Sequence, residues 1–363
     1  MTSQPRILSV ASAVPPFRYT QQDILQFGLE RILGAGWQAR QELSGDAHLI
    51  QRLFTSSQVR ERQSAVDLEA YYKETMPTTG ERMATYQSAS YELGRAAMEQ
   101  ALAQAGEMHK AQDISDFVVV SCTGYSAPGL DIQLARDLGM RRDVRRLIIG
   151  HMGCFGALAG LRQCLATMRA YPLATAAMLS VELSSLHFAP SLDPEALTEF
   201  ALFGDAAAAI ILGQDREGAA PELVDTYCAA DFAASDQMSW HIADQGFVMT
   251  LSPRVPITLR RNILGVIDKL LTPNGLAIAD VAHWIIHPGG PSILEAIQSK
   301  LALSSEQMAH SWRVLQDHGN CSSPTVLLIL EEVLRSGHTR TGEWGVMMAF
   351  GPGLTLETAL LRF

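Results

Sequence analysis

Three side chains in this sequence, those of Cys154, His287 and Asn320, are of the types used in acyl-transfer chemistry. Cys154 has glycine on either side at positions 153 and 156 and precedes an apolar helical segment. We therefore expect it near a helix N-terminus, where unpaired N–H groups and the helix dipole favour a thiolate. His287 follows an apolar strand, and Asn320 stands just before another predicted helix. A thiolate nucleophile needs a basic partner, and an amide N–H stabilises an oxyanion, so the three residues together predict nucleophilic catalysis by cysteine.

Each of the three residues also has a structural interpretation. Cys154 could be a small buried core thiol, His287 a strand-terminal residue bonded to the backbone, and Asn320 a helix cap or turn residue. We reject a metal site at His283 and His287, because four residues along a strand span about 13 Å.

The elements that must position these residues alternate between helix and strand. This alternation is typical of a layered α/β fold with buried sheets. Apolar periodicity predicts helices over 85–105, 154–169, 254–271 and 325–335, and strands over 117–120, 145–150, 178–181, 206–212 and 281–286.

The second half of the chain repeats landmarks of the first half. Asp116 and Asp280, 164 positions apart, each precede a buried strand that ends in a Pro/Gly loop. Gly153 and Gly319, 166 positions apart, each stand near the start of an apolar helix. We predict two duplicated halves, 1–215 with the cysteine and 216–363 with the histidine and the asparagine. The duplication would bring the two helix heads to either side of a shared centre.

Composition excludes several classes of function. The chain has 363 residues, 47% of them hydrophobic, which excludes a disordered or low-complexity protein. Its net charge of −10 disfavours a nucleic-acid partner, since that would require a basic face. The five cysteines are sparse and have no CxxC spacing, so we predict reduced thiols in the cytoplasm and no metal site. We find no signal peptide and no apolar run long enough to span a membrane.

Other candidate motifs are weaker. The sequence contains no P-loop, GxGxxG or GxSxG motif, so nucleotide hydrolysis, Rossmann hydride transfer and serine hydrolysis lack support. Arg52, Arg60 and Arg62 could meet phosphates, but a solvated surface is the favoured interpretation. The basic run 141–146 also indicates a solvated face.

Five motifs together resemble the type III polyketide synthase family, the chalcone-synthase-like condensing enzymes of the thiolase fold. They occur in the family order, while the first hundred residues match less distinctly. The motifs are Gly-Cys-Phe-Gly (153–156), Ala-Leu-Phe-Gly-Asp-Ala (201–206), His-Pro-Gly-Gly-Pro (287–291), Gly-Asn-Cys-Ser-Ser (319–323) and Phe-Gly-Pro-Gly-Leu-Thr-Leu-Glu (350–357).

The resemblance implies an αβαβα fold, a homodimer, and a role for each matched residue. Cys154 would take an acyl group from a coenzyme A thioester, with His287 holding it as a thiolate in an ion pair. His287 and Asn320 would stabilise the enolate formed when malonyl-CoA loses carbon dioxide. Repeated decarboxylative condensation and ring closure would give a pyrone or a resorcinol-type product. Coenzyme A thioesters would be the substrates, with no separate cofactor.

The resemblance also places the substrate pocket. Phe203 matches an aromatic gatekeeper, whereas the second gatekeeper is the more flexible Met249. Trp240 falls where plant members carry a small residue. A flavonoid starter is therefore disfavoured, and the bacterial alkylpyrone and alkylresorcinol branch suggests a fatty acyl starter. The further pocket positions are Cys122, Thr123, Ser184, His187, Ser322, Gly289, Pro352 and Gly353, with Arg52 and Arg60 as candidates for the coenzyme A phosphates.

Three rival functions remain open. A ketoacyl carrier-protein synthase III has the same Cys-His-Asn set but condenses once, and the Gly-Pro-Gly ending favours the polyketide branch over it. A cysteine hydrolase would pass the acyl group to water. A non-catalytic partner subunit is disfavoured by the intact triad.

Overall fold

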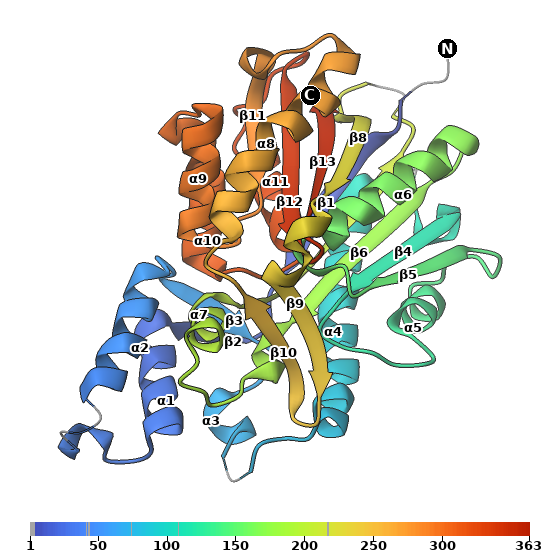
Figure 1. The fold of residues 1–363 in the computed structure, drawn as a ribbon. Helices are drawn as coiled ribbons and strands as arrows, with labels where there is room; N and C mark the ends of the chain where they lie inside the picture. Colours follow the sequence, from blue (N-terminus) through green and yellow to red (C-terminus); the bar gives the residue numbers. More distant parts are fainter. Residues whose placement is uncertain (1–3, 41, 43, 74, 108, 216–217) are drawn as a thin grey trace.

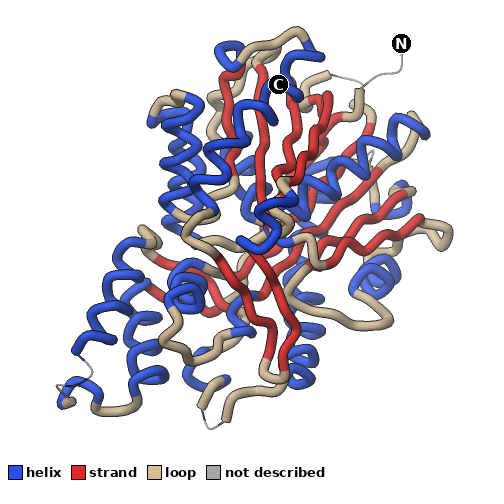
Figure 2. Tube along the Cα trace, in the orientation of Figure 1, coloured by secondary structure: helices blue, strands red, loops and turns tan. Residues whose placement is uncertain are grey.

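A mixed sheet of nine strands runs through the molecule in the order β11-β12-β13-β8-β1-β7-β6-β4-β5 (Figures 1 and 2). The computed structural model describes residues 4–40, 42, 44–73, 75–107, 109–215 and 218–363. The strands of this sheet are β1 (Arg6–Ala13), β4 (Asp116–Ser121), β5 (Arg145–Gly150), β6 (Ala176–Leu183), β7 (Asp205–Gly213), β8 (Glu222–Ala230), β11 (Val281–Ile286), β12 (Trp344–Gly351) and β13 (Thr355–Arg362).

Two antiparallel two-stranded sheets lie outside the large sheet: β2 (Phe17–Thr20) with β3 (Glu61–Ser64), and β9 (Met238–Ala243) with β10 (Gly246–Leu251). The α-helices are α1 (Gln21–Leu33), α2 (Ser44–Ser56), α3 (Leu68–Tyr71), α4 (Thr79–Ala105), α5 (Leu130–Asp137), α6 (Gly156–Ala170), α7 (Pro194–Leu202), α8 (Val255–Leu271), α9 (Pro291–Leu301), α10 (Ser305–His318) and α11 (Thr325–Arg335).

The strand order of the large sheet confirms the predicted duplication. Outward from the centre, one half runs β1-β7-β6-β4-β5 and the other runs β8-β13-β12-β11. The pairing types correspond, since β7–β6 and β13–β12 are antiparallel and β6–β4 and β12–β11 are parallel. A single residue pair, Arg6 with Glu222, joins β1 to β8. The boundary between 215 and 216 stays a prediction; it lies in the connection between β7 and β8, and residues 216–217 are outside the described residues.

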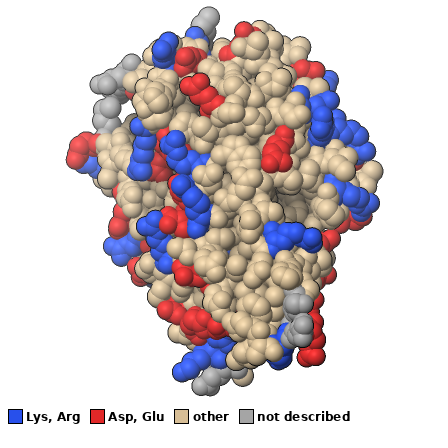
Figure 3. Space-filling view, turned by 90° about the vertical axis from the view of Figure 1, so that its left-hand side faces the viewer, with Lys and Arg blue, Asp and Glu red and all other residues tan. Residues whose placement is uncertain are grey.

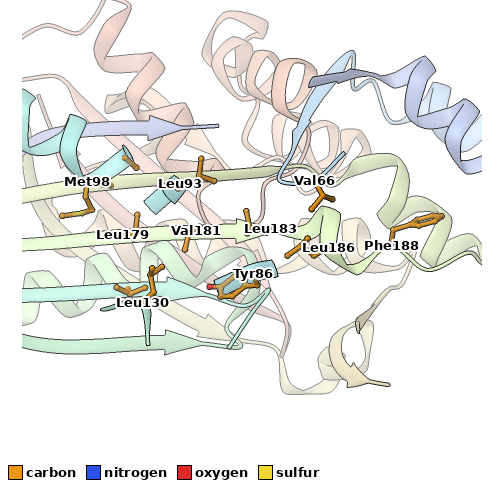
Figure 4. Packing of buried hydrophobic residues seen from close by; sticks show 14 of the residues in the cluster. Val66, Tyr86, Leu93, Met98, Leu130, Leu179, Val181, Leu183, Leu186 and Phe188 are labelled. Atoms are coloured by element: carbon orange, nitrogen blue, oxygen red, sulfur yellow. The ribbon is translucent and has the colours of Figure 1, made fainter. Parts of the chain in front are cut away.

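Three apolar clusters lie between the sheet halves and the helices, giving the α, β, α, β, α layers. The central cluster combines α6 and α11 with strands of both halves, and the outer clusters pack α1, α2 and α4 on one half and α8, α9 and α10 on the other. β6 is buried on both faces: Leu179, Val181 and Leu183 belong to the outer cluster (Figure 4), whereas Met178 belongs to the central one. Because side chains alternate along a strand, Glu182 points with Met178 toward the central layer.

The predicted elements agree with the structure except at some ends. The bounds of β5, β11 and α11 are those expected from the sequence. The predicted helix 85–105 begins earlier, at Thr79, because Thr78 and Glu81 form a capping box there. No described helix is long and apolar enough to cross a membrane. The face in Figure 3 carries interspersed basic and acidic side chains.

Candidate active site

Cys154 lies where the chain passes from β5 into α6, in a short 3-10 turn over Gly153–Phe155. Its side chain is 8% exposed and stands at the head of the central helix, as the sequence predicts. Gly153 has a φ of 72°, and a Cβ there would lie 2.5 Å from Cδ of Pro352. Only glycine fits this turn, so the packing of the Gly-Pro-Gly loop against it fixes the position of the thiol.

The thiol of Cys154 contacts residues from the other half of the molecule. Burial raises its pKa to about 12, and hydrogen bonds from the side chains of Ser322 and Asn320 act in the opposite direction. The buried carboxylate of Glu182 raises the pKa further. The structure therefore brings Cys154 and Asn320 together across the two halves.

The backbone and side chain of Asn320 are both held in place. Its N–H donates to the carbonyl of Leu202 at 2.8 Å, and its carbonyl accepts from the N–H of Gly204 at 3.1 Å. Its Oδ1 accepts from the backbone N–H of Ser322 at 2.8 Å. Because Oδ1 is used in this way, the amide Nδ2 is the atom available to the thiol and to a substrate oxygen.

His287 directly follows the last residue of β11 and makes no hydrogen bond to Cys154. Its N–H donates to the carbonyl of Met348 on β12 at 2.8 Å, and its ring packs at 5.5 Å from the ring of Phe350. Phe350 precedes Gly351, where a Cβ would be 3.3 Å from the backbone nitrogen of Cys154. Both ring nitrogens of His287 lack a partner among the described residues, and burial lowers its pKa to about 3. A fully buried imidazole without partners is costly, which points to a group supplied during the reaction.

Ser322 adopts an unusual backbone conformation beside the thiol. Its φ is 55°, in the left-handed region that non-glycine residues seldom occupy, and it is 6% exposed. Its N–H bonds to Asn320 and its side chain bonds to the thiol, so the strained turn orients both partners of Cys154.

Glu182 is a site residue that the sequence analysis did not select. It is fully buried, and burial raises its pKa to about 7. One oxygen accepts from the N–H groups of Cys122 and Thr123 and from the Thr123 hydroxyl, and the other accepts from the Ser323 hydroxyl at 2.6 Å. The sequence signal that could have singled it out is a lone charged residue in an otherwise uncharged strand.

Cys122 and Thr123, predicted pocket residues, form the loop after β4 that Glu182 holds. The sulfur of Cys122 accepts from the N–H of Gly153 at 3.0 Å, directly beside the nucleophile. Trp240 donates from Nε1 to the carbonyl of Cys122 at 2.9 Å, and His187 bonds to the carbonyl of Thr123 at 2.7 Å. Hydrogen bonds therefore connect these predicted residues to the loop beside the nucleophile turn. His187 is in the lining of the first cavity described below, whereas Cys122, Thr123 and Trp240 are in the described lining of neither cavity.

Two cavities flank α7. The first has a volume of about 370 Å³ and includes the predicted pocket residues Phe203, Met249, Ser184 and His187 in its lining. The second, of about 870 Å³, lies on the opposite side of the helix and includes Gly289. Glu195 of α7 lines both cavities. An isolated β-bridge joins Phe203 to Asn320, so the predicted gatekeeper lies next to a catalytic candidate.

The described lining of these two cavities contains none of Cys154, His287 and Asn320. The three residues are buried, with 8%, 0% and 1% exposure for Cys154, His287 and Asn320. Pro352 packs against Gly153, and Gly353 has a φ of 114°, so this pair supports the nucleophile turn rather than lining either cavity.

The three arginines considered as phosphate ligands, Arg52, Arg60 and Arg62, differ in burial and in hydrogen-bond partners. Arg52 is exposed on α2, whose neighbouring residues line the second cavity, and Arg60 is exposed and paired with Asp317. The coenzyme A role of both stays a prediction. The interpretation of Arg62 as solvated is wrong: it is 2% exposed, and its Nη1 donates to the carbonyl of Phe203 at 2.8 Å, because β3 carries it under the gatekeeper. Within the described part of the chain, no cluster of three or more His, Cys, Asp or Glu side chains is placed to hold a metal ion.

Family models match almost the whole chain. Residues 39–216 match the N-terminal domain of chalcone and stilbene synthases, and residues 229–363 match the C-terminal domain. A 1,3,6,8-tetrahydroxynaphthalene synthase of Streptomyces peucetius subsp. caesius is 35% identical over 98% of this chain and 93% of its own. A 3,5-dihydroxyphenylacetyl-CoA synthase of Streptomyces toyocaensis is 30% identical over 99% of this chain and 90% of its own.

Solved structures agree. A polyketide synthase of the brown alga Ectocarpus siliculosus superposes with a TM-score of 0.90 at 29% identity, over 100% of this chain and 99% of its own. The tetrahydroxynaphthalene synthase of Streptomyces coelicolor A3(2), a bacterial type III polyketide synthase, gives a TM-score of 0.90 at 26% identity, over 99% of both chains. With the two-half layered fold and the matched motifs, these similarities show that the chain belongs to the type III polyketide synthase family and is an acyl-transferring condensing enzyme.

Proposed function

We propose that Cys154 is the nucleophile that carries the growing acyl chain. Its sulfur attacks the thioester carbon of an acyl-CoA, forming a new thioester, while the sulfur–carbon bond to coenzyme A breaks and its thiol leaves with a proton. The observation that carries the proposal is the contact of a buried thiol at a helix head with Asn320 from the opposite half. Two further contacts support the proposal. The N–H of Ser322 donates to the side chain of Asn320 and so fixes it, and Glu182 accepts from the N–H of Cys122 and so holds the adjoining loop.

The condensation step uses Asn320 and His287 as hydrogen-bond donors. Malonyl-CoA loses carbon dioxide, and the electron pair of the broken carbon–carbon bond becomes an enolate whose oxygen is negative. The Asn320 amide and the His287 ring, both buried and fixed, would donate to that oxygen, which carries more charge in the transition state than in the substrate. The enolate carbon attacks the acyl group on Cys154, and the sulfur leaves as thiolate, ready for the next transfer.

Activation of Cys154 is proposed to come from proton transfer to His287. Burial acts against each charge separately, raising the pKa of the thiol and lowering that of the imidazole. Transfer of the proton creates opposite charges together, and their attraction in a dry site offsets both costs. The two unpartnered ring nitrogens of His287 support this role.

An ion pair between Cys154 and His287 predicts a weak dependence of the reactivity of Cys154 on pH. We expect the rate of Cys154 alkylation by iodoacetamide to change little between about pH 6 and 8.5 in the unmodified protein. In a His287→Gln variant the thiol has no imidazole partner, and burial, the largest effect on it, keeps its pKa above this range, so the rate should rise about tenfold per pH unit. Equal slopes in the two proteins would contradict the ion pair. The measurement is peptide mass spectrometry of timed reactions.

The starter is proposed to be a fatty acyl-CoA, and the product a pyrone or a resorcinol-type ring. The cavity beside Met249 supports this, because its walls include the apolar side chains of Ile24, Leu68, Phe188 and Phe200. The test is mass spectrometry of products formed with malonyl-CoA from acyl-CoAs graded from acetyl to palmitoyl. Products with two or more malonyl units from long starters support the proposal. A single extension would favour the ketoacyl-synthase function, and free acid without carbon dioxide a hydrolase.

A homodimer is proposed through the open edge of the sheet. Among the described strands, β5 pairs only with β4, and Leu147 and Ile148 on it are 42% and 50% exposed. An unpaired strand with exposed apolar side chains is an aggregation hazard unless another surface covers it. β5 leads directly into the nucleophile turn, so a second copy on this edge would also support Cys154.

We expect Ile148→Asp to shift the protein from dimer to monomer in sedimentation velocity, because burying a carboxylate at the edge is costly. Ile257→Asp is the matched control, since Ile257 is 72% exposed and lies on α8, which packs against β8 and β13 in the other half, and this variant should sediment like the unmodified protein. A dimer that survives Ile148→Asp unchanged would contradict this interface.

The cytoplasm remains the proposed compartment. All five cysteines are free thiols in the structure and four are buried, which supports a reducing environment.

A further inference from the structure

The β9–β10 hairpin carries the gatekeeper Met249 but is not part of the nine-stranded sheet (Figure 1). Its position over the site therefore depends on contacts to other elements. At its tip, Gly246 donates to Oγ1 of Thr79 at 2.8 Å, and at its base Leu251 donates to the carboxylate of Glu195 at 3.1 Å. Between these two ends, two side chains connect the hairpin to the loop after β4 at Cys122 and Thr123, which we call the nucleophile loop because Cys122 bonds to Gly153.

The two side chains attach the two strands to consecutive residues of the loop after β4. Trp240 on β9 donates from Nε1 to the carbonyl of Cys122 at 2.9 Å. On the other strand, the N–H of Phe247 donates to Nδ1 of His187 at 3.0 Å, and His187 bonds through Nε2 to the carbonyl of Thr123 at 2.7 Å. Because Cys122 also accepts from Gly153, the hairpin is connected to the nucleophile turn through this loop.

The chemistry of His187 suits a fixed linker and not an acid or base. A carbonyl only accepts and a backbone N–H only donates, so Nε2 must carry the proton and Nδ1 the lone pair. Burial lowers the pKa of His187 to about 4, which keeps this neutral form at assay pH. The ring stacks on Phe247 at 4.5 Å and meets Trp240 edge-on at 5.7 Å, so its orientation is determined on three sides.

We propose that His187 is a positioning residue that, together with Trp240, latches the β9–β10 hairpin to the nucleophile loop and thereby sets where Met249 stands. This inference rests on the proposed function, since the position of Met249 would determine how many malonyl units are added before release. His187 lines the cavity beside Met249 and Phe203, so loosening the latch widens the space offered to the chain.

The test compares three variants that remove one or two hydrogen bonds of the latch. Trp240→Phe keeps an aromatic ring and loses the N–H that bonds to Cys122. His187→Asn keeps an acceptor near the position of Nδ1 and loses the donor at Nε2. His187→Phe loses both the acceptor and the donor. We expect amide hydrogen exchange in 246–251 to rise about tenfold or more in Trp240→Phe and His187→Phe, and less in His187→Asn. The ratio of longer to shorter products should change at least about fivefold, because small displacements near the reacting groups have large effects.

Each variant is first loaded with the acyl group on Cys154 to the same extent, so that a change in acyl transfer does not enter the product ratio. His241→Asn, an exposed change on the same hairpin, is the matched control and should alter neither exchange nor products. Unchanged exchange in both Trp240→Phe and His187→Phe would overturn the latch. A product shift without faster exchange would also overturn it, since it would reflect pocket volume alone.

The failure of the latch and the failure of the proposed function are distinguishable. If the unmodified protein makes no polyketide from any acyl-CoA, the proposed function fails. If it does and the variants keep its product ratio, the latch fails and the proposed function stands.

Discussion

Replacing Cys154 by alanine is expected to abolish product formation, with a loss of at least about 10³-fold in kcat/KM. The variant retains the Asn320 and His287 donors but has no atom to hold the acyl chain. Decarboxylation of malonyl-CoA, which needs only the donors, should therefore persist at a measurable rate. The measurements are product mass spectrometry and release of carbon dioxide from carboxyl-labelled malonyl-CoA.

Cys164→Ala is the matched control. Cys164 is also buried and lies on α6, the helix that follows the nucleophile turn, but it packs in the central apolar cluster. We expect near-normal turnover and at most a modest loss of stability in this variant. Triketide products from the Cys154→Ala variant at more than trace levels would refute covalent catalysis by this residue.

Replacing Asn320 by aspartate is expected to lower condensation by about 10² to 10³-fold, the range typical for loss of one oxyanion donor. The substitution keeps the shape of the side chain, and one carboxylate oxygen still accepts from the Ser322 N–H. The other oxygen replaces the amide N–H that faces the thiol. A negative charge there also raises the pKa of Cys154, so the deficit should be larger at pH 7 than at pH 9.

A comparison with Asn320→Ala separates the loss of the hydrogen-bond donor from the effect of the added negative charge. Asn320→Ala removes the donor without adding charge, so its deficit should be similar in decarboxylation but less dependent on pH. Circular dichroism and thermal unfolding serve to show that both variants fold. Decarboxylation at the unmodified rate in both variants would show that Asn320 is not an oxyanion donor.

Much of the fold could be predicted because its signals are local. β5, β11 and α11 each combine a continuous apolar pattern with clear turn residues, and their predicted bounds agree with the structure. The duplication could be seen from two offsets between Asp and Gly landmarks, and the strand order confirms it. The pairing of Cys154 with Asn320 follows from the same symmetry, because equivalent helix heads meet at the centre.

The features that were missed depend on contacts between distant segments. Arg62 looks like a surface residue in its own segment, but β3 places it beneath Phe203. Glu182 is one acidic residue in an apolar strand, and its role appears only when Cys122, Thr123 and Ser323 surround it. The left-handed turn at Ser322 has no glycine to mark it. Hydrogen bonds of this kind are not encoded in local periodicity or composition.

The most direct test of the account is single-turnover mass spectrometry of Cys154. Mixing the protein with acyl-CoA alone should add the mass of the acyl group to the peptide that carries Cys154 and to no other peptide. A chase with malonyl-CoA should then remove it while an extended product appears, with one carbon dioxide released for each malonyl unit in that product. An unlabelled Cys154, or an acyl group that leaves as free acid, would contradict the account.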